Sequence, residues 1–437
     1  MAEEAPVEEP APAEEATPVA LTAGLEDKGY NRADFVAVLA QDEIPAGPAQ
    51  LTRLHHMFGF DTSLFSNVAY VEQGVLLSIA GNALVVMDLR VSPPTRKYVF
   101  GVDGRGVGSF VLHPTEPLVV VGEKGNDPNI YIFEYPTWKV LRVLRKGTER
   151  SYLSLAFSPD GKKLASVGGN PDYMLTIWDW RQERITLHTK AFGQDIFQCI
   201  FSPDDPGRLT TSGTGHIRFW RMAKTFTGLK LQGDIGKFGK VELSDVVDFA
   251  ELPDGKVLST SENGALLLWE GNFIKCCFVR PGGKSAHDGA ITSVNLVFKD
   301  PNDRSKGGAF ITTGADGKIC WWDFKTIDEA EVDADNSLDF EVEPARELSV
   351  GENVNIHSVL QGDYAGDHYI IIDKNGAMWR LDLPTGGTGN MATLMDQVEE
   401  DAIKAAAPTE EAAGEGAEGE AAAAEGEAAA AEGEAAA

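Results

Sequence analysis

The sequence predicts an all-β fold, a seven-bladed β-propeller flanked by acidic tails. Seven successive units end in a doublet of a large apolar residue and a polar residue, with spacings of 46, 45, 42, 49, 53 and 59 between the second residues. Each unit also contains short apolar runs separated by Pro, Asp and Gly turns, as antiparallel strands require. A unit of this length forms a small sheet that must stack on its neighbours to bury its faces. The doublets are Met87-Asp88, Phe133-Glu134, Trp178-Asp179, Trp220-Arg221, Trp269-Glu270, Trp322-Asp323 and Leu381-Asp382.

The third unit shows the internal order most clearly. Residues 152–157 (YLSLAF) have strand-like alternation, and Ser158-Pro159-Asp160-Gly161 has turn chemistry. Residues 163–167 and 175–178 then supply the second and third strands, the latter ending at the doublet. This order, with a Trp-Asp type of ending, is typical of a WD repeat.

A fourth, outer strand follows most doublets, for example at residues 138–144, 184–190 and 273–279. After the seventh doublet only a Gly-Gly-Thr-Gly run at 386–389 is evident. We therefore expect residues 51–60 (LTRLHHMFGF) to supply the missing strand from the other end and close the ring.

The net charge of −29 belongs mainly to the two ends of the chain. Residues 1–50 contribute −9 and residues 391–437 contribute −12, which leaves −8 for residues 51–390. Both ends are rich in Ala and Glu and poor in large apolar residues, so we expect disordered acidic tails at 1–50 and 391–437 around a propeller at 51–390. A central region of mild negative charge argues against nucleic-acid binding.

The remaining composition indicates a protein without a metal or cofactor. The four cysteines form no CxxC pair and have no zinc-type spacing to histidines, so we interpret them as reduced thiols. The adjacent His55 and His56 would point to opposite faces of a strand, which disfavours a shared metal. No secretory signal and no run of about 20 apolar residues is present, so no membrane association is expected.

We interpret one group of His, Thr, Asp and Trp residues as a hydrogen-bonded network. In WD blades, an Asp six residues before the Trp can join a His, a hydroxyl and that Trp, and the sixth unit offers His287, Thr312, Asp316 and Trp322. The same residue types also resemble a hydrolase triad, but the WD spacing accounts for all four as structural residues. We therefore expect no catalytic residues.

The network is expected to be incomplete in other units. Asp127 holds the Asp position in the second unit, and Asp172 holds it in the third, before Trp178. Thr214, Asn263 and Gly81 replace it in the fourth, fifth and first units, which are expected to depend more on apolar packing.

Two inserts exceed what a blade connection needs. Residues 222–244 carry aromatic and apolar side chains among lysines, a combination suited to a partner-binding loop on a rigid scaffold. The alternative is an ordinary outer strand and loop. The second insert, residues 325–343, is acidic and is expected to be a flexible excursion. The candidate partner-binding residues are Phe226, Leu229, Lys230, Phe238 and Lys240.

Several strings outside the doublets resemble one family, the cilia- and flagella-associated protein 44 group of axonemal WD-repeat proteins. They cover residues 51–385 and include HHMFGFD at 55–61, EYP at 134–136, NPDY at 170–173, TFTGLKLQG at 225–233 and ELPDGKVLS at 251–259. The resemblance implies a non-enzymatic scaffold of the motile cilium or flagellum. Its partners would be a companion WD-repeat tether-head subunit, inner-arm dynein heavy chains and the doublet microtubule.

The same resemblance implies a location in the cytoplasm and cytoskeleton, in the axoneme, and a role in ciliary beating. Members of the family are much longer, with a further propeller and coiled-coil regions. The alternative function is a general cytosolic WD-repeat adaptor, such as a substrate receptor or a platform for complex assembly.

Overall fold

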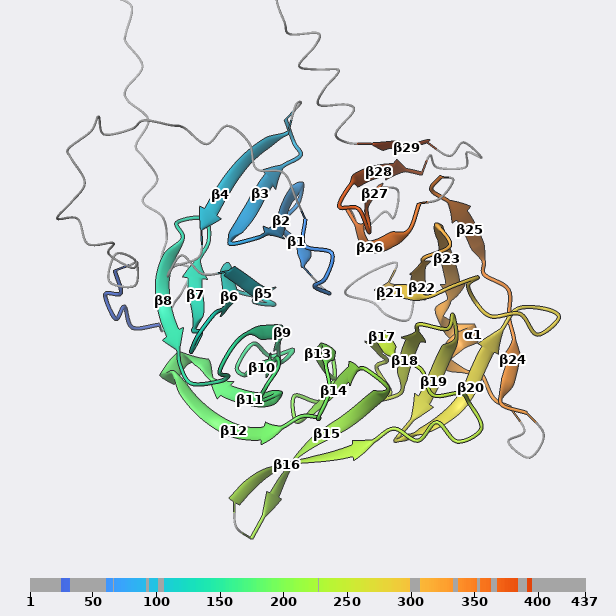
Figure 1. Ribbon diagram of the computed structural model, residues 1–437, viewed down its shortest axis with the longest axis horizontal. Helices are drawn as coiled ribbons and strands as arrows, with labels where there is room; N and C mark the ends of the chain where they lie inside the picture. Colours follow the sequence, from blue (N-terminus) through green and yellow to red (C-terminus); the bar gives the residue numbers. More distant parts are fainter. Residues whose placement is uncertain are drawn as a thin grey trace, which may run out of the picture.

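The protein forms a closed ring of seven sheets (Figure 1). A computed structural model describes residues 25–31 and 60–394, except 66, 92–93, 101–105, 227, 299–306, 333–336, 352–353, 363–367 and 384–390. In each sheet the first strand lies nearest the axis and the fourth lies at the rim (Figure 1). The predicted all-β, seven-bladed propeller is therefore confirmed.

The first three blades each contain four consecutive antiparallel strands. Blade 1 has β1 (Val68–Glu72), β2 (Val75–Ala80), β3 (Ala83–Asp88) and β4 (Thr95–Phe100). Blade 2 has β5 (Gly106–Leu112), β6 (Leu118–Lys124), β7 (Ile130–Glu134) and β8 (Lys139–Leu144). Blade 3 has β9 (Tyr152–Phe157), β10 (Leu164–Gly168), β11 (Met174–Asp179) and β12 (Arg184–Lys190), with the 3₁₀ helix η3 (Trp180–Gln182) before β12.

The other four blades repeat this order with one exchange between blades 5 and 6. Blade 4 has β13 (Ile196–Phe201), β14 (Arg208–Gly213), β15 (His216–Thr225) and β16 (Gly228–Ile235). Blade 5 has β17 (Val246–Glu251), β18 (Val257–Ser261), β19 (Leu266–Glu270), β20 (Phe273–Val279) and β24 (Asp339–Glu341). Blade 6 has β21 (Ile291–Phe298), β22 (Gly308–Gly314), β23 (Lys318–Asp323) and β25 (Arg346–Ser349), with α1 (Phe324–Asp328) after β23. Blade 7 has β26 (Ile356–Gln361), β27 (His368–Asp373), β28 (Met378–Asp382) and β29 (Met391–Leu394).

Burial depends on the position of a strand in its blade. Every residue of β2, an interior strand, is buried, because neighbouring blades cover both of its faces. The rim strand β12 alternates between exposed and half-buried residues, as expected where one face meets solvent. The strand predicted at 152–157 is β9, and most of its residues are buried. The blade interior is therefore apolar on both faces.

Seven apolar clusters hold the ring together, one at each interface between neighbouring blades. The closing interface, between blades 7 and 1, contains Ile370 and Ile372 from β27 against Val68, Leu76 and Met87 from blade 1. Each blade thus buries apolar side chains against two neighbours.

The predicted closure by residues 51–60 is wrong. The rim position beside β28 is occupied by β29, which pairs with it antiparallel from Trp379↔Leu394 to Asp382↔Met391. This four-residue strand directly precedes an Ala/Glu-rich sequence and begins one residue beyond the expected propeller boundary, which explains why its pattern was missed. Phe60 packs on the cluster between blades 7 and 1, and residues 51–59 lie outside the described part of the chain.

A short piece of the expected N-terminal tail is docked on the ring. Lys28 and Tyr30 both bond to the Glu183 carboxylate, at 2.5 and 2.8 Å, and Asp27 pairs with Lys139 of β8. Leu25 packs on the cluster between blades 2 and 3. Residues 25–31 therefore differ from the predicted disordered tail, because their few apolar and charged side chains meet complementary groups on blades 2 and 3.

The expectation that residues 325–343 form a flexible excursion is also wrong for the residues described. This insert leaves blade 6 through α1, where Ile327 is fully buried, and then adds β24 in parallel to β20 of blade 5. Cys277 donates its backbone N–H to the Leu338 carbonyl at 2.7 Å, and the Phe340 and Phe278 rings lie 5.8 Å apart. We call residues 324–332 and 337–342 the clasp, since they join blades 5 and 6 at the rim (Figure 1).

Candidate partner-binding site

The four predicted network residues of blade 6 lie together in the interior. His287 Nδ1 is 3.0 Å from Asp316 Oδ1, and its Nε2 is 2.9 Å from Thr312 Oγ1. Trp322 donates its indole N–H to the same hydroxyl at 2.8 Å. Because a carboxylate only accepts, Nδ1 carries the proton, and the Thr312 hydroxyl, which accepts from Trp322, also bonds to Nε2. The network links β22 and β23 to the segment before β21.

The electrostatics of this network favour a structural role. Burial by itself raises the pKa of the Asp316 carboxyl, but hydrogen bonds from His287 and from the Asp288 and Lys318 backbone outweigh it and lower the pKa. Thr312 is fully buried, and two neighbouring side chains already engage its hydroxyl. A substrate therefore has no route to this hydroxyl in the described structure.

The other blades retain parts of the network. In blade 3, Thr148 replaces the histidine and donates to Asp172 at 2.8 Å, while Trp178 donates to Ser166. Asp127 of blade 2 is held through its backbone N–H, which donates to the Glu149 carbonyl. Trp220 and Trp269 of blades 4 and 5 still donate to hydroxyls, of Thr211 and Ser259 respectively. The Trp–hydroxyl bond thus persists in two blades where the Asp is replaced.

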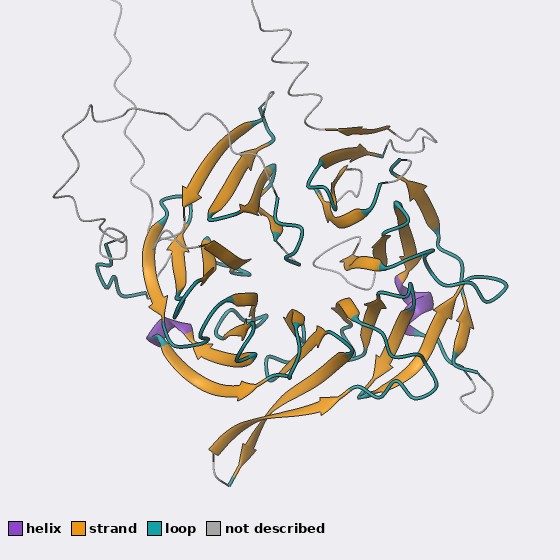
Figure 2. Cartoon of the chain, viewed as in Figure 1, coloured by secondary structure: helices purple, strands orange, loops and turns teal. Residues whose placement is uncertain are grey.

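The first long insert forms a two-stranded ribbon that projects past the rim (Figures 1 and 2). Residues 218–225 of β15 pair with all eight residues of β16, whereas β14 pairs with β15 only from His216 to Arg221. Beyond Arg221 the ribbon has no third strand among the described residues. We define residues 222–231 as the ribbon.

One face of the ribbon changes from buried to exposed towards its tip. Met222 and Leu231 face each other across the strands and pack on the cluster between blades 3 and 4. The next pair on that face, Lys224 and Leu229, is exposed. Phe226 at the tip is fully exposed. An apolar stripe thus runs out from the core into solvent.

The structure divides the five predicted partner-binding residues into two groups. Phe226, Leu229 and Lys230 are exposed on the ribbon, and Lys240 is exposed on the loop after β16. Phe238 is instead half-buried against the cluster between blades 4 and 5, with its ring 5.2 Å from that of Trp269. Phe238 is therefore placed as a packing residue.

A second exposed apolar group lies near the base of the ribbon. Ile235 ends β16 and Phe273 begins β20, and about half of each side chain is exposed. Lys237 places its Nζ 4.7 Å from the centre of the Phe273 ring. The sequence gives little sign of this group, because its members come from different blades.

The described part of the chain contains no cluster of three or more potential metal ligands, and no helix in it has the length and apolar character needed to cross a bilayer. His55 and His56, which were not expected to share a metal, lie outside the described residues.

The stacked sheets, the buried Trp–hydroxyl bonds and the exposed ribbon define a WD-type β-propeller with a projecting surface element. The chain belongs to the family described as the echinoderm microtubule-associated protein first β-propeller, whose model matches residues 105–360.

Relatives extend this assignment to ciliary proteins. The chain is 46% identical over 337 residues to cilia- and flagella-associated protein 44 of Mus musculus, covering 77% of this chain and 18% of that protein. It is 43% identical over 368 residues to the protein of the same name from Chlamydomonas reinhardtii, covering 83% and 20%. The predicted resemblance is confirmed, and the chain spans about a fifth of the length of these relatives.

Solved structures support the fold. The Cps50 (Swd1) β-propeller domain of Myceliophteria thermophila aligns with a TM-score of 0.52 and 13% identity over 66% of this chain and 85% of that one. The C-terminal WD40 domain of Sif2 aligns with a TM-score of 0.51 and 15% identity over 74% and 82%.

Proposed function

We propose that this propeller is a non-catalytic scaffold of the motile ciliary or flagellar axoneme and that the ribbon is its main partner-binding element. Its role would be that of a tether or tether-head subunit, which anchors an inner-arm dynein to the doublet microtubule and regulates beating. The identity of 43–46% to cilia- and flagella-associated proteins supports the location. The fully exposed Phe226 is the observation that supports the binding element.

The ribbon has the physical properties of a binding element. The ring anchors one end through Met222 and Leu231, so the tip is presented from a rigid base. Binding would bury Phe226 and Leu229 together, and a buried aromatic anchor typically carries about 2 kcal/mol or more of binding free energy. Lys224 lies opposite Leu229 on the same face, and Lys230 is exposed on the other face of the ribbon, so both add positive charge that favours an acidic partner surface.

The test is retention of the tagged chain in detergent-extracted axonemes, comparing wild type with Phe226→Ala in cells that lack the endogenous protein. We expect wild type to remain in the axoneme and to co-purify with inner-arm dynein heavy chains and a companion WD-repeat protein. Loss of the Phe226 ring should lower retention by about tenfold or more.

Thr186→Ala is the matched control, since Thr186 is exposed on the rim strand β12 away from the ribbon tip. Its retention should equal that of wild type. Complete extraction of wild type by detergent would contradict the axonemal proposal, whereas full retention of Phe226→Ala would contradict only the role of the ribbon.

A further inference from the structure

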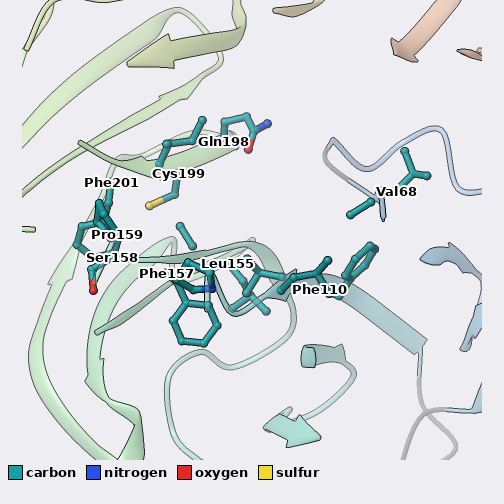
Figure 3. Close-up of a pocket in the computed structure, with 15 residues that line it drawn as sticks. Val68, Phe110, Leu155, Phe157, Ser158, Pro159, Gln198, Cys199 and Phe201 are labelled. Atoms are coloured by element: carbon teal, nitrogen blue, oxygen red, sulfur yellow. The ribbon is translucent and has the colours of Figure 1, made fainter. Parts of the chain in front are cut away.

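Two adjoining cavities lie along the axis of the ring. The larger, of about 400 Å³, is lined by the innermost strands of blades 1 to 4, and Figure 3 shows Val68, Phe110, Leu155 and Cys199 facing it. Its walls are predominantly apolar. The smaller cavity, of about 100 Å³, is enclosed by blades 1 and 4 to 7. Val68 and Gln198 line both cavities, so the two adjoin at these residues.

The smaller cavity is the more polar of the two and contains a buried carboxylate. Asp248 of β17 lines it together with Gln198, Thr292, Asn295 and His357. We call this cavity the polar chamber and the larger one the apolar chamber. An apolar space of this size that meets a few polar groups is the usual form of a small-ligand site.

Asp248 has hydrogen bonds but no positively charged neighbour in contact with it in the described structure. Oδ1 accepts from the Phe249 backbone at 2.8 Å and from the Gln198 amide at 3.2 Å, and Oδ2 accepts from the Val294 backbone at 2.9 Å. Burial raises the pKa of this carboxyl to about 7 despite these bonds. Oδ2 keeps capacity to accept another donor, and a cation would stabilise the ionised form.

The opposite wall of the polar chamber adds further polar groups. Burial lowers the pKa of His357, which is 7% exposed, while hydrogen bonding to the Thr62 and Leu64 backbone opposes this shift. The Ser358 hydroxyl is buried without a described partner. A buried polar group in this condition is uncommon and normally meets water or a ligand. Phe65 stacks on the His357 ring, at 6.1 Å between centroids, and forms part of the same wall.

We propose that the axial cavities bind a ligand with a short apolar body and a cationic head, a guanidinium or an ammonium group. The head would occupy the polar chamber and donate to Asp248 Oδ2. The body would pass Val68 and Gln198 into the apolar chamber. Free small molecules and the arginine or lysine side chain of a partner share this chemistry.

The experiment is ligand-observed NMR titration of the full chain with n-butylguanidinium, with neutral n-butylurea as the near-isosteric comparison. We expect butylguanidinium to bind with a dissociation constant of about 1 mM, typical of a ligand with so few atoms. Butylurea should bind at least about tenfold more weakly, because it lacks the charge-assisted hydrogen bond. Equal binding of both compounds, or no binding of butylguanidinium, would overturn the proposal.

Two variants test whether the ligand binds in the polar and apolar chambers. Asp248→Asn should weaken butylguanidinium binding at least about tenfold, whereas Asp234→Asn, at an exposed position on the rim strand β16, should not change it. If Asp248→Asn fails to fold, Ile200→Trp tests the same proposal by filling the apolar chamber, and it should also abolish binding. Unchanged binding in a folded Ile200→Trp variant would contradict the assignment.

A second arm distinguishes the two sources of the ligand. The capped peptide acetyl-Gly-Arg-Gly-amide presents the same head on a protein backbone. Binding of the peptide more tightly than butylguanidinium would identify a partner side chain as the natural occupant. Tighter binding of butylguanidinium would identify a free small molecule. Either order of the two affinities supports a site for a cationic group.

Discussion

Replacing Thr312 with Val tests the hydrogen-bonded network of blade 6 with little change in volume. The substitution removes the hydroxyl that accepts from Trp322 Nε1 at 2.8 Å and bonds to His287 Nε2 at 2.9 Å. The indole nitrogen of Trp322 and Nε2 of His287 then each lose a hydrogen-bond partner in the interior. An unsatisfied buried polar group costs about 1–3 kcal/mol, so the free energy of unfolding should fall by about 2–4 kcal/mol, allowing for partial relaxation.

Blade 5 supplies an internal comparison. Ser259→Ala removes a hydroxyl that accepts from Trp269 Nε1 at 2.8 Å, and this leaves one ring nitrogen without its partner instead of two. We expect a loss of about 1–2 kcal/mol, roughly half that of Thr312→Val. Thr186→Val, on the exposed face of β12, should change stability by less than about 0.5 kcal/mol.

Urea unfolding followed by Trp fluorescence and circular dichroism measures these differences, provided that the two signals coincide. A Thr312→Val variant as stable as wild type would refute the network as a source of stability. Equal losses for Thr312→Val and Ser259→Ala would refute the argument that the histidine adds to the Trp–hydroxyl bond.

Three further predictions follow from packing and charge. Phe238→Ala should lower the free energy of unfolding by about 1–3 kcal/mol, because its ring packs on Trp269, while Phe226→Ala should stay within about 0.5 kcal/mol in the same urea assay. Phe340→Ala should loosen the clasp and speed hydrogen exchange at the Cys277 amide, whereas exchange in blade 2 should stay unchanged; uniform acceleration would instead indicate global destabilisation. Burial raises the pKa of Asp248 to about 7, so the folded state binds this proton more tightly than the unfolded state, and the stability contributed by this group should fall as pH rises from about 4 through 7. His113, His216 and His357 have a pKa lowered by burial and contribute the opposite slope, so the test is the difference between variants. Asp248→Asn should lose less stability than wild type as pH rises over this range; an identical pH dependence would show that Asp248 does not titrate in this range.

Periodicity made the blade number and most strands predictable. Rim strands predicted at residues 184–190 and 273–279 coincide with β12 and β20, because outer strands alternate in polarity between clear turns. The blade 6 residues His287, Thr312, Asp316 and Trp322 were also recognisable, since their spacing reflects a local geometry repeated in each WD unit.

Long-range pairing was less predictable. The sequence does not show that β24 leaves blade 6 to join β20, because a three-residue strand has little periodicity. The four residues of β29 gave too weak a signal for the same reason, so an N-terminal segment was wrongly assigned to their place. Within the partner-binding insert, Phe226 and Phe238 have similar sequence surroundings, and only the fold separates a solvent-exposed ring from one that packs on Trp269.

Cross-linking of intact axonemes, followed by mass spectrometry, tests the proposed scaffold most directly. Lys224 and Lys230 are exposed on the ribbon, and Lys162 is an exposed comparison in the turn before β10. We predict that both ribbon lysines cross-link to other axonemal proteins, including inner-arm dynein or a companion WD-repeat subunit, and that Lys162 does so much less. Cross-links to such proteins from Lys162 and other positions, with none from the ribbon, would contradict the account.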